Sequence, residues 1–348
     1  MTSLPEDRDP WNHPEETTAA PSGSGDWPLP PTVSAPADNG YAPWGPEPQG
    51  PLPVAEPPRT DPPRAEAPYF DQFEPAPPPP ERIPNFGHLC ILGLLLVVGL
   101  LCTSLIVGVS LRHQLFGVST KEQAISNIHY TLGSEGLLYL FTLAACLIVF
   151  PLVWHKGFFA GVQWNFTTAL RLRWRLVSAA GACFLLAFVD SVLVPGPSNA
   201  PIDKIFREPG AAWLLFGFGI TFAPFFEEMF FRGFLLPTLC TAYDWFDERI
   251  KHRPRLPLAE NGHPQWTVPA MIFGAILTSI PFAALHAQQT GYSWGPFVLL
   301  VGVSLVLCAI RLSTRSLACS TLVHSSYNFI LFVFMLVGTH GFRHLSNM

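Results

Sequence analysis

Charged residues are scarce in this sequence. Asp, Glu, Lys and Arg together make up 13% of its 348 residues, about half of the share that is usual in soluble domains. Hydrophobic residues account for 49%, and the mean hydropathy is +0.30. This composition argues against a soluble globular domain and indicates a polytopic membrane protein.

Basic clusters and cysteine motifs are missing as well. The formal net charge is −5 and the Lys and Arg residues are scattered, so neither nucleic acid nor a polybasic contact with lipid is expected. The cysteines form no CxxC pair and no zinc-ligand spacing, which favours a role as small packing residues. All seven lie in or beside apolar segments: Cys90, Cys102, Cys146, Cys183, Cys240, Cys308 and Cys319.

Residues 1–82 contain no apolar segment that could be the core of a signal peptide, so we expect the first apolar segment to be retained as an anchor. This stretch is rich in Pro, Ala, Glu, Asp and Gly. Such a composition buries too little apolar surface to offset chain entropy, and it predicts a disordered tail. Isolated aromatic residues leave a tail-binding partner open, although a solvated linker is the favoured interpretation.

Residues 83–348 contain seven apolar runs, most of them near the roughly 20 residues that cross a bilayer as a helix. They predict an all-α, multi-pass membrane domain of about seven helices embedded in the lipid bilayer. Pro281, inside the fifth run, predicts a kink or local unwinding. The runs are Leu89–Leu111, Leu137–Trp154, Leu176–Leu193, Ala211–Leu239, Trp266–His286, Pro296–Ile310 and Leu317–Val337.

Basic residues are concentrated in alternate loops. Because Lys and Arg are retained on the cytoplasmic side of short loops, the richer set and the N-terminal tail are expected to be cytoplasmic, in a protein of the cell membrane. The richer set is Lys156, Arg171, Arg173, Arg175, Arg249, Lys251, Arg253, Arg255, Arg311 and Arg315, and the poorer set is Arg112, Lys121, Lys204, Arg207 and Arg343.

Three ionisable residues lie inside the fourth apolar run, and Arg232 is expected to be the sole basic residue deep in a span. A charge at bilayer depth costs at least about 2.5 kcal/mol, so it persists where it is paired or faces a wet cavity. Glu228 lies four residues before Arg232 on the same helix face, and the two can neutralise each other. Glu227 points about 100° away and needs a partner from another helix.

Two later runs offer that partner. His286 ends the fifth run, with Phe282 one turn before it, while His324 and Asn328 lie one turn apart on the seventh. Residues four apart project from the same face of a helix. A carboxylate, two imidazoles and a carboxamide can activate water and stabilise an oxyanion, so catalysis is favoured over helix-to-helix hydrogen bonding.

These motifs carry a family resemblance. In order and on successive apolar runs, they resemble the CPBP family of intramembrane proteases, which contains the CAAX prenyl endopeptidases and the bacteriocin-immunity Abi proteins. The resemblance covers about Ala211 to Val337, the expected catalytic core. The motifs are Glu227-Glu228-x-x-x-Arg232, Phe282-x-x-x-His286 and His324-x-x-x-Asn328.

The resemblance implies cleavage of a peptide bond in a membrane-associated protein or peptide, CAAX-type or other. Glu227 with His286 would polarise the attacking water. His324 with Asn328 would stabilise the tetrahedral oxyanion. Glu228 and Arg232 would hold the motif helix in place.

Alternatives remain for both cofactor and function. Glu227, His286 and His324 are the ligands of a zinc site with an open position, if a metal is present, but no HExxH helix occurs. Asn328 suits an oxyanion donor better than a zinc ligand, so a metal-free site without cofactor is favoured. A proton- or ion-coupled transporter is the main alternative function, although the first three runs lack an equivalent motif. A bacteriocin-immunity type membrane protein is another, and the substrate stays open.

Overall fold

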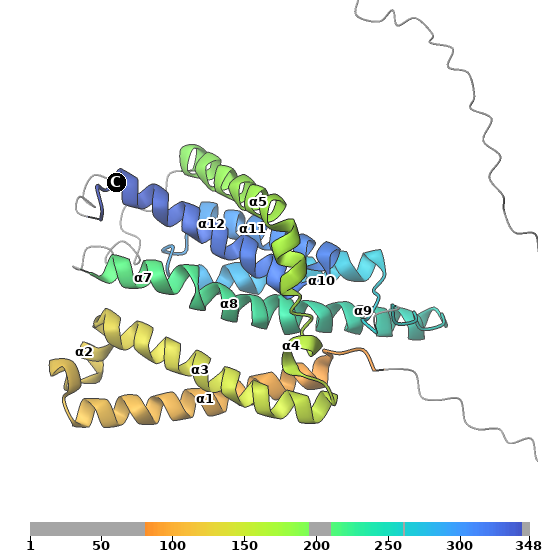
Figure 1. Cartoon of the computed structure of the whole chain (residues 1–348), viewed down its shortest axis with the longest axis horizontal. Helices are drawn as coiled ribbons and strands as arrows, with labels where there is room; N and C mark the ends of the chain where they lie inside the picture. Colours follow the sequence, from red (N-terminus) through yellow and green to blue (C-terminus); the bar gives the residue numbers. More distant parts are fainter. Residues whose placement is uncertain (1–80, 195–209, 260–261, 343–348) are drawn as a thin grey trace, which may run out of the picture. The chain divides into compact units, whose positions relative to one another are not determined.

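The computed structural model describes residues 81–194, 210–259 and 262–342, which form helices joined by loops (Figure 1). No β-strand occurs in these ranges, and the expected all-α class is confirmed. Up to residue 80, the tail that was predicted to be disordered lies outside the described residues. Arg82, at its expected end, is buried, and its Nη2 lies 2.7 Å from Oε1 of Glu248.

Seven helices of the described ranges are long and apolar enough to cross a membrane, as the sequence predicted. The fourth is a composite of several elements. In chain order they are α1 (Phe86–Arg112), α3 (Ile128–Trp154), α5 (Phe166–Leu193), the composite span Ala211–Ile250, α10 (Val268–His286), α11 (Trp294–Thr314) and α12 (Leu317–Gly338). The connecting segments include η1 (Leu115–Gly117), α2 (Lys121–Ser126) and α4 (Phe158–Gly161).

Polar side chains set where several of these helices begin. The Asn127 side chain accepts from the backbone N–H groups of the first turn of α3, and Asn165 does the same for α5. Thr267 caps α10 by accepting from the N–H of Ala270. Such caps satisfy donors that have no partner within the helix. As a result, α3 and α5 begin well before the apolar runs from which they were predicted.

The composite span departs from a regular α-helix near its centre. It consists of α7 (Ala211–Ile220), α8 (Phe222–Glu228), the π-helix η2 (Met229–Leu235) and α9 (Leu236–Ile250). Thr221 separates the first two, with φ −122° and ψ −77°. The local unwinding predicted at Pro281 is not found, because α10 stays helical through that residue. The irregular backbone is instead next to the Glu227 motif.

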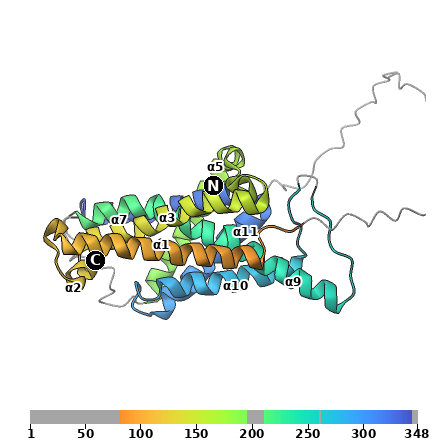
Figure 2. The ribbon, with the colours of Figure 1, turned by 90° about the horizontal axis from the view of Figure 1, so that it is seen from below.

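The composite span packs against two groups of helices. Phe234 of η2 meets Phe150, Trp154 and Phe158, which come from α3 and α4. On another face, α12 contacts α7, α8 and η2, and it shares a buried core with α5 and α11. Figure 2 shows α1 and α3 running side by side along this domain. The packing brings α8, α10 and α12, which carry the three motifs, to one place.

Candidate active site

The Glu228–Arg232 pair expected from sequence is present and completely buried. Arg232 Nη1 donates to Oε1 of Glu228 at 2.9 Å, and both side chains are 0% exposed. Arg232 Nη2 donates to the Ser304 hydroxyl at 2.6 Å. The guanidinium also lies 4.5 Å from the centre of the Phe282 ring, within reach of a cation–π interaction. Helices η2, α10 and α11 are thereby joined around one cation.

Hydrogen bonds orient both imidazoles of the site. The Nδ1 atom of His286 lies 2.8 Å from the carbonyl oxygen of Phe282, and Nδ1 of His324 lies 3.0 Å from Oε1 of Glu228. Since a carbonyl and an ionised carboxylate only accept, each Nδ1 carries a proton. In the neutral imidazoles, each Nε2 is then an acceptor.

Both Nε2 atoms point at the same carboxylate oxygen. Glu227 Oε2 lies 3.7 Å from Nε2 of His286 and 3.8 Å from Nε2 of His324. This oxygen is buried, and it finds no hydrogen-bond partner in the described part of the chain. Three acceptors at this spacing need a donor between them, and a water molecule supplies two hydrogens. The two imidazoles that face Glu227 come from other helices, α10 and α12.

These side chains line a cavity of about 560 Å3. Five of the seven predicted site residues face it, whereas Glu228 and Arg232 are buried behind its wall. Within the described ranges, no Lys or Arg lines the cavity. Its predicted site residues are Glu227, Phe282, His286, His324 and Asn328, and further polar lining comes from Thr131, Glu135, Gln288, Gln289, Thr290 and Tyr327.

Asn328 has a structural contact that sequence did not predict. Its Nδ2 donates to the carbonyl oxygen of Gly219 at 2.7 Å. Gly219 lies two residues before the break at Thr221, so the contact ties α12 to the end of α7. The amide group has two hydrogens, and the second remains for a ligand in the cavity.

Glu135 is a cavity residue that sequence reasoning missed. It lies on the second turn of α3 and accepts from the Tyr139 hydroxyl at 2.6 Å. The Tyr139 ring stacks on Phe226, with the ring centroids 4.4 Å apart, and Phe226 precedes Glu227. The signal was an acidic residue two positions before an apolar run that was predicted to begin at Leu137. The cap at Asn127 starts the helix earlier and places Glu135 inside the span.

Arg311 corrects a second expectation. It was assigned to a cytoplasmic loop, but it lies inside α11 and is only 2% exposed. Its Nε donates to the carbonyl oxygen of Arg232 at 3.2 Å, and its Nη2 donates to that of Val162 at 3.4 Å. Arg232 is therefore not the only basic residue within a span. Through its hydrogen bond to the Arg232 carbonyl oxygen, Arg311 holds the π-helical segment η2 against α11.

The donor atoms of the site are of the kinds that bind zinc, since a carboxylate and two imidazoles are usual zinc ligands. However, no group of three His, Cys, Asp or Glu side chains in the described ranges is arranged to hold a metal ion. Glu227, His286 and His324 therefore do not fit together as a ready-made three-ligand site. The water-bridged interpretation of the three acceptors does not depend on a metal.

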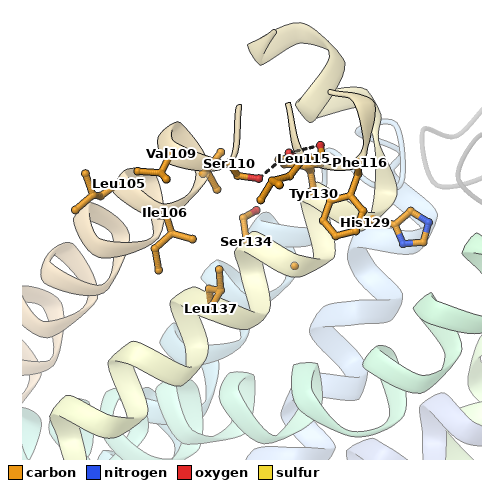
Figure 3. Close-up of a pocket in the computed structure, with 12 residues that line it drawn as sticks. Leu105, Ile106, Val109, Ser110, Leu115, Phe116, His129, Tyr130, Ser134 and Leu137 are labelled. Carbon is orange, nitrogen blue, oxygen red and sulfur yellow. Dashed lines mark hydrogen bonds between the residues drawn. The ribbon is translucent and has the colours of Figure 1, made fainter. Parts of the chain in front are cut away.

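A second cavity, of about 580 Å3, lies between the end of α1 and the start of α3 (Figure 3). Leu105, Ile106 and Leu137 are among its mainly apolar lining residues. The Tyr130 hydroxyl lies 2.7 Å from that of Ser110 and 2.9 Å from the Leu115 carbonyl oxygen. No Asp or Glu of the described residues lines this second cavity. Among the described residues, a carboxylate and two imidazoles meet in the cavity around Glu227.

The described helices thus place a carboxylate and two imidazoles around an internal cavity of a domain with seven membrane-capable helices. Residues 209–330, 122 of the 348, match the family model described as type II CAAX prenyl endopeptidase Rce1-like. The match includes all three motifs and confirms the family that they suggested. Over this segment, the chain is similar to the Rce1-like proteases. No curated protein and no solved structure matches it.

Proposed function

We propose that this protein is an intramembrane endopeptidase that uses Glu227 to activate water. The observation that carries the proposal is the buried Oε2 of Glu227, which has no hydrogen-bond partner among the described residues and faces two imidazole Nε2 atoms inside the cavity. A buried oxygen without a hydrogen bond costs free energy unless a polar guest satisfies it. A water molecule held there lies beside a base and within the space available to a peptide.

The bond changes follow from this placement. The water oxygen attacks the carbonyl carbon of the scissile peptide bond as Glu227 takes a water proton. The carbonyl becomes an oxyanion, for which the second amide hydrogen of Asn328 is a donor. Collapse of this intermediate breaks the C–N bond, and the leaving nitrogen receives the proton held by Glu227.

Glu228 acts through His324 in this scheme. Its Oε1 lies 3.0 Å from Nδ1 of His324 and fixes the orientation of that ring, so that Nε2 faces the cavity. Glu228 is therefore a positioning residue that also neutralises Arg232. The same scheme gives His286 the task of orienting the water, with its Nδ1 held by Phe282.

Substrate trapping tests this function. Membranes that contain the wild type, Glu227→Gln or Glu122→Gln are compared for peptide fragments by mass spectrometry. Glu122 is an exposed carboxylate on α2, outside the cavity, and serves as the matched control. We expect fragments that appear with the wild type and with Glu122→Gln but not with Glu227→Gln. Identical fragment sets for all three would refute the role of Glu227.

A metal-free reaction is part of the proposal and has its own test. Purified enzyme treated with a strong chelator should keep its turnover, because the three acceptors do not form a three-ligand site. The chelated sample is also measured after zinc is added back. Loss of turnover that zinc restores would replace the water-bridged scheme with a metal-dependent one.

A further inference from the structure

The cavity around Glu227 lies in one half of the membrane domain. On the composite span its lining residues end at Glu227, and all the others precede it. On α10 and α12 they begin at Phe282 and His324 and continue towards the C-terminal ends. On α3 they occupy only the first turns, from Ile128 to Glu135. Because α3 and the composite span run in one direction and α10 and α12 in the other, all four contribute from the same end (Figure 1).

The opposite end is closed by packed and ion-paired side chains. Behind Glu227 lie Glu228 and Arg232, both 0% exposed, and then Arg311 at 2%. Phe234 and Leu236 continue this buried layer along the composite span. A peptide that entered from this end would have to displace a buried ion pair, which costs several kcal/mol. The cavity is therefore reached from the end at which α10 joins α11.

The loops at the two ends differ in charge. The closed end carries Lys156, the three Arg residues at the start of α5, the four basic residues at 249–255 and Arg315, which makes nine without the buried Arg82 and Arg311. In the described residues, the open end carries two, Arg112 at the end of α1 and Lys121 in α2. Basic residues close to span ends are retained in the cytoplasm. The closed end is therefore the cytoplasmic one.

We infer that the cavity opens to the non-cytoplasmic side of the membrane. This inference rests on the proposed protease function. The substrate is then a peptide segment exposed on the non-cytoplasmic side, such as the flank of a membrane-spanning protein. Two carboxylates, Glu135 and Glu227, face this cavity, and no Lys or Arg of the described ranges does. A neutral or cationic segment suits it better than an acidic one. A lipid-anchored tail on the cytoplasmic side would meet the closed end.

Cysteine labelling tests the orientation without relying on activity. Cys90 and Cys102, the two native cysteines that are not buried, are replaced by Ser, while the five buried ones stay in place. Single variants Gln289→Cys at the cavity mouth and Arg253→Cys at the closed end are then exposed to a membrane-impermeant maleimide. Both positions are exposed, so each is accessible on its own side.

In right-side-out vesicles, we expect Gln289→Cys to be labelled and Arg253→Cys to be labelled only after detergent permeabilisation. Inside-out vesicles should give the reverse. Thr131→Cys, on the other side of the mouth, repeats the measurement if Gln289→Cys is poorly produced. Labelling of Arg253→Cys but not of the mouth in right-side-out vesicles would overturn the inference, and so would equal labelling of both.

A pair of reporters then tests the substrate class. Each is a single-pass membrane protein with the same neutral flanking segment, placed on the non-cytoplasmic side in one and on the cytoplasmic side in the other. We expect the wild type, but not Glu227→Gln, to cut only the first. Cutting of the second alone would overturn the orientation and leave the protease intact. Cutting of neither would count against the proposed protease, while the labelling result would still decide the orientation.

Discussion

Two adjacent glutamates should fail in different ways when each is changed to glutamine. Glu228→Gln leaves Arg232 buried without its counter-charge, although Ser304 still accepts from it. Breaking one side of a buried ion pair costs about 3–5 kcal/mol. At about 2–4 °C per kcal/mol for a domain of this size, Tm should fall by roughly 6–20 °C. The variant should also accumulate poorly in the membrane.

Glu227→Gln should behave in the opposite way. Its side chain is 21% exposed, and its Oε2 lies 3.7 Å from Nε2 of His286 and 3.8 Å from Nε2 of His324. Glutamine keeps the shape of the side chain but cannot take a proton from water. We expect Tm to change by no more than a few degrees and turnover to fall by a factor of about 100 or more, which is the scale of general base catalysis.

Thermal melts and single-turnover cleavage, measured on the same purified samples, separate the two effects. Turnover is normalised to folded protein, so a loss of accumulation is not counted as a loss of chemistry. If Glu227→Gln were unstable while Glu228→Gln were stable and inert, the roles of the two glutamates would be exchanged. If both variants were stable and fully active, the buried pair would be no more than a structural contact and the hydrolase scheme would fail.

Other predictions concern the rest of the site and its surroundings. Asn328→Ala should lower turnover about 100-fold, as expected for one oxyanion donor, and single-turnover rates at wild-type level would remove that role. A chain that begins at Glu81 should insert and cleave, and a stable, inserted but inactive protein would show that the tail is needed. In that chain, Arg82→Gln should lower Tm by a few degrees, because it breaks the contact with Glu248, and an unchanged Tm would show that this contact adds little. Burial, together with the charges of Lys156, Arg311 and Arg315, lowers the pKa of His263 from its ordinary value of 6.5. Its unfolded form therefore binds a proton first, so stability should fall as the pH drops through 6.5, and His263→Gln should weaken this dependence of Tm on pH.

The sequence carried enough information for the spans and for most of the site. Apolar runs identify the seven helices because a bilayer demands about 20 apolar residues for each. The spacing of four residues between Glu228 and Arg232 predicts their pairing, which survives even though η2 is π-helical. The convergence of Glu227 with His286 and His324 could be anticipated because each lies in an apolar run and needs a polar partner.

Tertiary contacts decide what the sequence could not show. Proline is the strongest helix-breaking signal in these spans, yet the chain stays helical at Pro281. The irregular backbone is instead found at Thr221 and in η2, where the sequence gives no stronger local signal. Arg311 sits just before a loop in the sequence, and only the packing against Arg232 and Val162 places it inside. Helix length is set by caps as well as by hydrophobicity, which is why Glu135 fell outside the predicted span.

The buried ion pair also bears on how the chain enters the membrane. Ser304 follows Arg232 by 72 residues, and His324 follows Glu228 by 96, so both are synthesised long after the composite span has left the ribosome. Until α10, α11 and α12 arrive, Arg232 depends on Glu228 for its counter-charge. Because the two lie one turn apart on the same helix, this pair can move from the translocation machinery into lipid with its two charges already balanced. Loss of Glu228 would then be felt during biogenesis, before there is any active site to damage.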